Sequence, residues 1–210
     1  MPLLLCLPLV AHAEPRFVDR SVALVNGHVI TFSELQFESR VYFVHKGGVE
    51  AAFGPLDTDT LRKTLDLLIG QRLETGEADK LKAYPLEEGE LTHALQSFSA
   101  RLGGPSQLER FLKQFEADES MLALVLARTL RTQRLLDGKL RLKAQVSEAE
   151  ASRVQSERAD LKGLAVTAVR QRLFSERFTA LTAAELAAVR KAAAVRLLGP
   201  FAAAADGGLL

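Results

Sequence analysis

The feature that most constrains the fold is a short β-hairpin close to the start of the chain. Residues 21–25 (SVALV) are rich in β-forming side chains, and residues 28–30 (HVI) run back after Asn26 and Gly27. An Asn-Gly pair supplies the two positive φ angles of a type I′ turn, a favoured two-residue hairpin connection. Two strands of this length are only marginally stable in water. A third strand must therefore come from another part of the chain.

A helix follows the hairpin directly. Thr31 and Glu34 match the T-x-x-E pattern of a capping box, in which the two side chains satisfy free backbone N–H groups at a helix start. The predicted helix runs from Phe32 to about His45 and ends at the glycine pair 47–48. The hairpin and this helix therefore form one local unit.

Helical spacing of apolar residues continues through most of the chain. Large apolar side chains recur every three or four residues in two stretches: Leu61, Leu65, Leu68, Ile69 and Leu73, and then Leu91, Leu95, Phe98 and Leu102. After a break at 103–105, Ser106 and Glu109 match a second capping box, and Asp118 can cap the next helix. The apolar positions of that next helix, within 121–136, fit helical spacing only loosely.

Asp137-Gly138 followed by KLRLKAQV has two interpretations. An Asp-Gly pair before an alternating stretch is typical of a hairpin, whereas one interior glycine costs a helix only about 1 kcal/mol. The residues alone leave both open. Ser147 and Glu150 then match a third capping box, which opens a short helix to about Asp160.

A long helix and a short strand close the predicted domain. Apolar residues from Val166 to Val189 indicate a long amphipathic helix. Residues 193–198 favour a strand, which ends at Gly199-Pro200. The last ten residues, 201–210, are rich in Ala and Gly, and we expect a flexible tail there.

The first thirteen residues have the pattern of a secretory signal peptide. They carry no charged side chain, they are apolar from Leu3 to Val10, and residues 11–13 (AHA) match the small-residue motif for cleavage after Ala13. The single cysteine, Cys6, lies in this segment, so the mature chain would have neither a disulfide nor a cysteine nucleophile. No later stretch reaches the roughly 18 consecutive apolar residues of a membrane span. The sequence therefore predicts an exported protein with no integral membrane segment in its mature part.

Charge and motif content argue against several functional classes. Lys and Arg number 27 against 26 Asp and Glu, so no global field recruits nucleic acid or an anionic membrane. Motifs for phosphate binding, zinc proteolysis and serine hydrolysis are missing. His28, His45 and His93 are scattered, and the basic run from Arg128 to Lys143 spreads around a helix as a solvated face would. We therefore predict no catalytic residue, no metal site, no cofactor and no nucleic-acid partner.

Several stretches resemble the SurA-type family of periplasmic chaperones and peptidyl-prolyl isomerases. The opening VDRSVALVNGHVITFSELQ is similar to the strand, Asn-Gly turn, strand and helix with which its members begin. LRKTLDLLIGQRLETGEADKL is similar to the family's second helix, and VSEAEASRV to the segment that leads out of the amino-terminal domain. The closing VRQRLFSERFTALTAAELAAVRKAAAVRLL resembles the carboxy-terminal helix and strand, with Phe174, Leu186, Arg190 and Val195 at matching positions.

The resemblance implies a mainly α fold, a multi-helix cradle with a small antiparallel β-sheet in which the hairpin at 21–30 pairs with the strand at 193–198. It also implies that KLRLKAQV is helical and that residues 14–200 form one SurA-N-like chaperone domain, including the C-terminal helix and strand. Members that isomerise proline bonds carry parvulin domains before the last helix. Here that interval is only residues 155–165, far below the roughly 50 residues of a small domain. We therefore expect no isomerase activity and no enzyme.

For function, the resemblance implies an ATP-independent periplasmic holdase that binds apolar segments of unfolded exported and outer-membrane proteins. A rival interpretation is a non-catalytic scaffold subunit that binds one envelope partner, and the sequence leaves self-association open. Candidate client-binding residues are Tyr42, Phe43 and Val44 near the end of the first helix and Phe53 after it, because four apolar residues in a row from Val41 exceed one helix face. The alternative is that these side chains fill the core.

Overall fold

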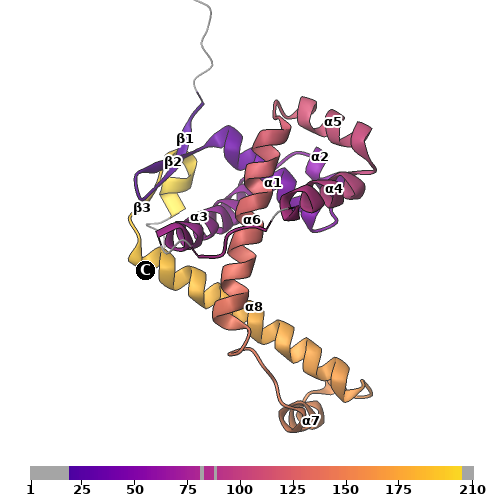
Figure 1. The fold of residues 1–210 in the computed structure, drawn as a ribbon. Helices are drawn as coiled ribbons and strands as arrows, with labels where there is room; N and C mark the ends of the chain where they lie inside the picture. Colours follow the sequence, from indigo (N-terminus) through magenta and orange to yellow (C-terminus); the bar gives the residue numbers. More distant parts are fainter. Residues whose placement is uncertain (1–18, 81–82, 88, 205–210) are drawn as a thin grey trace, which may run out of the picture.

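Residues 19–80, 83–87 and 89–204 are described by a computed structural model, in which helices form the body and a small sheet lies at one side (Figure 1). The strands are β1 (Ser21–Val25), β2 (His28–Thr31) and β3 (Val195–Leu197). The helices are α1 (Phe32–His45), α2 (Val49–Phe53), α3 (Thr58–Lys80), α4 (Glu90–Leu102), α5 (Pro105–Gln114), α6 (Glu119–Leu140), α7 (Glu148–Glu157) and α8 (Val166–Ala192), with 3₁₀ turns η1 (Ala159–Leu161) and η2 (Gly199–Ala204). The predicted mainly α fold with a small antiparallel sheet is confirmed. The predicted signal peptide, residues 1–13, lies outside the described residues.

The early hairpin and the end of the chain form one antiparallel sheet with strand order β2-β1-β3. Val25 of β1 pairs with His28 on one side and with Val195 on the other. Asn26 has φ 48° and the next glycine φ 87°, as a type I′ turn requires. The N–H of Asn26 donates to the carbonyl of Ala194 at 2.9 Å, and its side-chain carbonyl accepts from the N–H of Ala194 at 3.2 Å. The turn therefore closes the hairpin and also holds the last strand.

The prediction of a flexible tail from residue 201 is wrong for its first residues. They form η2, and Phe201 is only 1% exposed, in the same core cluster as Val22, Ile30 and Leu65. The prediction was based on the Ala- and Gly-rich composition of the segment and overlooked Phe201, whose ring packs in the core beneath the sheet. Residues 205–210 lie outside the described part of the chain.

Three of the predicted helix starts are built as the sequence indicates, and at the start of α7 Ser147 Oγ accepts the N–H of Glu150 at 3.1 Å. Thr31 Oγ1 accepts the N–H of Glu34 at 3.3 Å, and the carboxylate of Glu34 accepts the N–H of Thr31 at 3.5 Å, which completes the capping box of α1. Asp118 accepts the N–H of Met121 at 2.8 Å and caps α6. These bonds satisfy backbone donors that a helix start would otherwise leave free.

The Ser106–Glu109 capping box is wrong. Helix α5 begins at Pro105, and its N-cap residue, Gly104, makes no side-chain bond. Proline suits the first helical position because its fixed φ is already helical and its missing N–H needs no partner there. Ser106 therefore lies inside the first turn instead of capping it.

Helix α6 runs through Asp137-Gly138 to Leu140, so this Asp-Gly pair makes no hairpin. The helix predicted from the resemblance stops there, and residues 141–144 form turns. A Cβ on Gly138 would lie 2.7 Å from the hydroxyl oxygen of Tyr84. Tyr84 belongs to residues 83–87, which we call the strap. The glycine thus makes room for the strap where it crosses α6.

Helix α6 lies at the centre of the body, and α8 crosses below it and continues beyond the body to carry α7 (Figure 1). Helix α3 contacts α1, α6 and α8. Where α3 meets α8, a Cβ on Gly70 would lie 3.0 Å from a methyl carbon of Leu186, so the two helices touch closely. None of the helices in the described ranges has the length and apolar character needed to cross a lipid bilayer.

Candidate functional site

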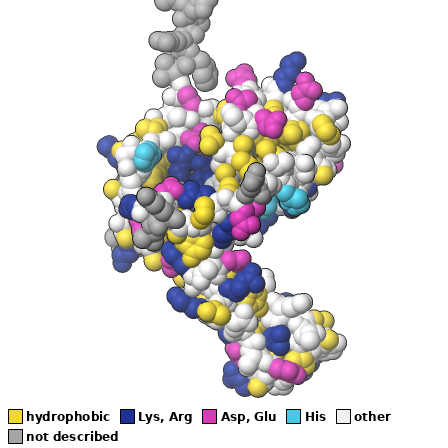
Figure 2. All heavy atoms as spheres, in the orientation of Figure 1, with side chains coloured by type: hydrophobic (Ala, Val, Ile, Leu, Met, Phe, Trp, Pro, Cys, Tyr) yellow, Lys and Arg dark blue, Asp and Glu magenta, His cyan; other side chains and the backbone are white. Residues whose placement is uncertain are grey.

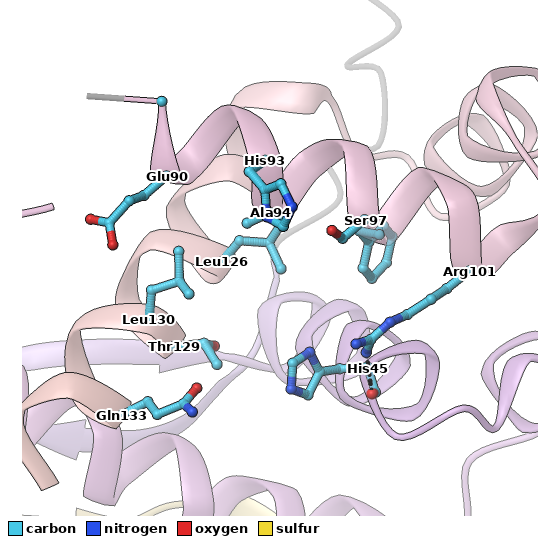
Figure 3. A pocket seen from close by; sticks show the side chains of 12 residues that line it. His45, Glu90, His93, Ala94, Ser97, Arg101, Leu126, Thr129, Leu130 and Gln133 are labelled. Atoms are coloured by element: carbon cyan, nitrogen blue, oxygen red, sulfur yellow. Dashed lines mark hydrogen bonds between the residues drawn. The ribbon is translucent and has the colours of Figure 1, made fainter. Parts of the chain in front are cut away.

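Two adjoining hollows form one groove along α6. The first, about 460 Å³, lies between α4, α6 and the end of α1 (Figure 3). The second, about 260 Å³, lies between α1, α3, α6 and α8. Both are lined by His45, Leu126, Thr129 and Gln133, so they lie next to each other along α6. We call the combined feature the α6 groove. The first hollow alone falls within the roughly 300–1,000 Å³ typical of ligand sites.

Apolar side chains from five helices form most of the groove's surface. They are Val41 and Tyr42 of α1, Leu67 and Leu68 of α3, Ala94 and Phe98 of α4, Val125, Leu126, Leu130 and Leu136 of α6, and Phe178 and Leu186 of α8. In the first hollow, the side chains of α4 point toward those of α6, with the end of α1 below them (Figure 3). The amphipathic periodicity of each helix therefore leaves part of its apolar face on this groove.

Hydroxyl groups in the groove differ in their hydrogen bonding. Thr64 Oγ1 donates to the carbonyl four residues earlier at 3.0 Å, and Thr129 Oγ1 does the same at 2.9 Å. Thr132, only 4% exposed, and Thr182 have buried hydroxyl oxygens with no partner among the described residues. A buried hydroxyl without a partner costs about 1–3 kcal/mol. These two oxygens have almost no accessible surface, so the polar groups that face the groove are instead the side-chain amides of Gln71 and Gln133.

One end of the groove is basic. Arg101 of α4 lies there beside the end of α1 and donates a hydrogen bond to the backbone carbonyl of His45, whereas His93 lies about two turns back along α4 (Figure 3). Arg101 makes no ion pair with any carboxylate in the described ranges. Burial lowers the pKa of His45, and the charges of Arg101 and Lys46 lower it further. Its imidazole is therefore neutral near pH 7.

Of the four predicted client-binding residues, only Tyr42 lines the groove, where it is 37% exposed. The prediction for Val44 is wrong, because its side chain is fully buried. Phe43 and Phe53 pack against a core cluster of the helical body, and the ring of Phe53 lies 5.7 Å from that of Phe111. The apolar run from 41 to 44 is thus shared between the core and the groove.

Sequence reasoning missed most of the groove, including Leu67, Leu130 and Phe178. The one available signal was in α6, whose apolar positions fit a single helical stripe only loosely. A central helix with packed neighbours on several sides needs apolar residues around more of its circumference. The loose pattern was thus a sign of this position.

The expectation that the basic run of α6 is a solvated face is also wrong. Arg128 pairs with the buried carboxylate of Glu38, and Lys139 lies 2.8 Å from that of Glu74, which is fully buried. Burial raises the pKa of Glu38, and the charge of Arg128 opposes that rise. Lys and Arg side chains gather in a hollow between the sheet and the helices (Figure 2). These cations therefore neutralise buried carboxylates.

Within the described ranges, no three His, Cys, Asp or Glu side chains gather in an arrangement that could hold a metal ion. Comparison with known proteins adds no family: no protein-family model matches the chain, and no curated protein matches it. The SurA-type resemblance therefore stays a prediction from short motifs, and the candidate site rests on its own geometry.

Proposed function

We propose that this chain is an ATP-independent holdase that binds apolar segments of unfolded exported polypeptides in the α6 groove, without catalysing a reaction on them. The observation that carries the proposal is the groove itself, an apolar surface drawn from five helices. Large apolar surfaces left open on a folded protein typically mark interaction sites.

The energetics suit transient binding. A client segment that buries about 400 Å² of apolar surface gains about 10 kcal/mol at ~25 cal/mol per Å². Association costs of about 4 to 15 kcal/mol cancel most of that gain. The remaining affinity is micromolar or weaker, so a client leaves without ATP.

The closed sheet supports a stable groove. Pairing of β1 with β3 fixes the end of α8, and the close contact of Gly70 with Leu186 fixes its middle against α3. Leu186 and Phe178 of α8 form one wall of the groove. A wall held at two points keeps its apolar face available instead of collapsing onto α6.

Protection of an unfolded outer-membrane β-barrel protein from aggregation tests the proposal. The test variant is Leu67→Gln/Leu130→Gln, which places two amides in the groove at half-buried positions. The matched control is Leu124→Gln/Leu142→Gln, which changes two leucines outside the groove that are 69% and 84% exposed. We expect the groove variant to lose at least half of the light-scattering suppression and the control to keep it, with both folded by circular dichroism.

Equal protection by the groove variant and the control would contradict the proposal. A second, unrelated client, such as reduced and unfolded α-lactalbumin, separates a holdase from a dedicated scaffold subunit. Protection of both clients supports the holdase, whereas protection of neither, with tight binding of one folded partner, supports the scaffold.

A further inference from the structure

We propose that the α6 groove selects the carboxy-terminal end of its client, binding the free α-carboxylate at Arg101 and the last few apolar residues along α6. This rests on the proposed function and names the part of the client that the groove takes. Two observations carry it: a guanidinium without a carboxylate at one end of the groove, and the side-chain amides of Gln71 and Gln133 along its surface.

The guanidinium of Arg101 is placed for an anion. One of its N–H groups donates to the carbonyl of His45, which orients the side chain across the mouth of the first hollow, and no other hydrogen bond of this side chain is found in the described part of the chain (Figure 3). The acid of this hollow, Glu90, lies about three turns away at the start of α4, where Arg134 and the N–H of Glu87 bind its carboxylate. A guanidinium binds a carboxylate through paired N–H groups.

Two helices end near this site, and their last carbonyls carry partial negative charge that opposes an anion. Arg101 itself neutralises the carbonyl of His45, and Lys46 follows directly at the end of α1. His93 lies eight residues before Arg101, about two turns toward the start of α4, and lines the same hollow further along. Arg101 and Lys46 are the only Lys or Arg side chains among the described lining residues of the two hollows, and the second hollow also holds the carboxylate of Glu38. The local balance of charge therefore favours a client carboxylate at Arg101.

A fatty acid would also combine a carboxylate with an apolar chain, but the groove's polar groups favour a polypeptide. The side-chain amides of Gln71 and Gln133 line this surface, and each has both a donor and an acceptor. An alkyl chain offers nothing to these groups, whereas an extended backbone offers both N–H and C=O.

The length of the groove sets the length of the bound segment. The lining residues of α6 from Leu126 to Leu136 extend about 15 Å at 1.5 Å per residue. An extended chain advances about 3.3 Å per residue, so about five residues fit. The carboxylate lies at the α4 end, and the chain leads from there toward α8.

Fluorescence anisotropy of a labelled peptide tests this directly. The probe is fluorescein-Gly-Ser-Gly-Ser-Gly-Val-Ala-Leu-Val-Leu with a free carboxylate, compared with the same peptide ending in an amide. We expect the amide to bind at least tenfold more weakly to the intact protein. Arg101→Gln abolishes this difference by weakening only the free acid, whereas Arg110→Gln, at an exposed arginine of α5, preserves it.

Gln133→Leu tests the second observation, because leucine has a similar size and removes the amide at an exposed position of the groove. We expect both peptides to bind at least threefold more weakly to a protein that unfolds at no lower urea concentration than wild type. Dodecanoate is the competing ligand, and its displacement of the acid peptide at lower concentration than the unlabelled peptide would assign the site to a lipid and overturn the proposal.

Equal affinity of the acid and the amide, in a protein that protects clients, would overturn the terminal-carboxylate assignment and leave the proposed function standing. No binding of either peptide by a protein that still protects clients would have the same consequence. No binding together with no protection would overturn both.

Discussion

Replacing Gly138 by Ala tests the packing of the strap on α6. In an exposed helix, the change stabilises by about 1 kcal/mol, because alanine is a far better helix former than glycine. Here the new Cβ would lie 2.7 Å from the hydroxyl oxygen of Tyr84, which is closer than real contacts allow, and 3.2 Å from a ring carbon, which is tighter than most. The tyrosine must therefore leave its place or the strap must lift.

The magnitude follows from the burial of the ring. A tyrosine buries about 150–250 Å² when fully enclosed, and Tyr84 is half-buried, so about 100 Å² is lost when the ring moves. At ~25 cal/mol per Å² this costs about 2.5 kcal/mol. Set against the gain in helix propensity, Gly138→Ala lowers the free energy of unfolding by about 1.5 kcal/mol.

Tyr84 itself adds a second measurable term. Its φ is 56°, in the left-handed region, which costs a residue with a side chain about 1–2 kcal/mol. Tyr84→Ala removes the ring but keeps the strain, so it lowers the free energy of unfolding by about 2.5 kcal/mol. Tyr84→Gly also relieves the strain and loses about 1 kcal/mol less.

Urea unfolding followed by far-ultraviolet circular dichroism measures the cycle of Tyr84→Ala, Gly138→Ala and the double variant. We expect Gly138→Ala to stabilise the Tyr84→Ala protein by about 1 kcal/mol although it destabilises wild type, a coupling of about 2.5 kcal/mol. Unchanged dependence on urea concentration checks that the folded state stays comparable. Additive effects, or stabilisation of wild type by Gly138→Ala, would refute the packing of the strap on this glycine.

Three further changes probe other parts of the fold. Phe201→Ala, at a residue 1% exposed, should lower the free energy of unfolding by about 3–5 kcal/mol in a urea titration, whereas a mobile residue would cost nothing. Arg128→Met should cost about 3–5 kcal/mol at pH 7.5, because it leaves the carboxylate of Glu38 buried. The pKa of Glu38 is already raised by burial, and it rises further when Arg128 is removed. As the pH falls, Glu38 therefore takes up a proton in the folded variant before it does so in the unfolded chain, so the stability lost by Arg128→Met should shrink between pH 7.5 and 5. A loss of stability that stays constant over this range would contradict the prediction. Asp118→Ala should cost about 1 kcal/mol in the same assay, because Met121 N–H loses its cap.

Local signals predicted the local structure. The Asn-Gly turn and the Thr31–Glu34 capping box act within a few residues, so the bounds of α1 and of the hairpin follow from the sequence. The Ser106–Glu109 box failed because Pro105 competes for the same helix start. Where two local signals conflict, the sequence pattern does not say which prevails.

Distant contacts decided the remaining features. Gly138 is typical of a turn by its sequence context, but its function in the fold is to admit a side chain 54 residues earlier, Tyr84. Phe201 looks like part of a tail until the core beneath the sheet is assembled. The groove also depends on distant contacts, because the sequence of one helix does not indicate which of its apolar residues the neighbouring helices will leave uncovered.

The small sheet and the groove are connected through α8. Helix α8 supplies a groove wall through Leu186 and Phe178, and it is followed directly by β3, whose Val195 pairs with Val25 of the hairpin. Without that pairing, α8 is still held against α3 by the contact of Leu186 with Gly70 and by the ion pair of Arg190 with Asp66. The sheet therefore adds a further attachment at the end of the helix that forms this wall of the groove.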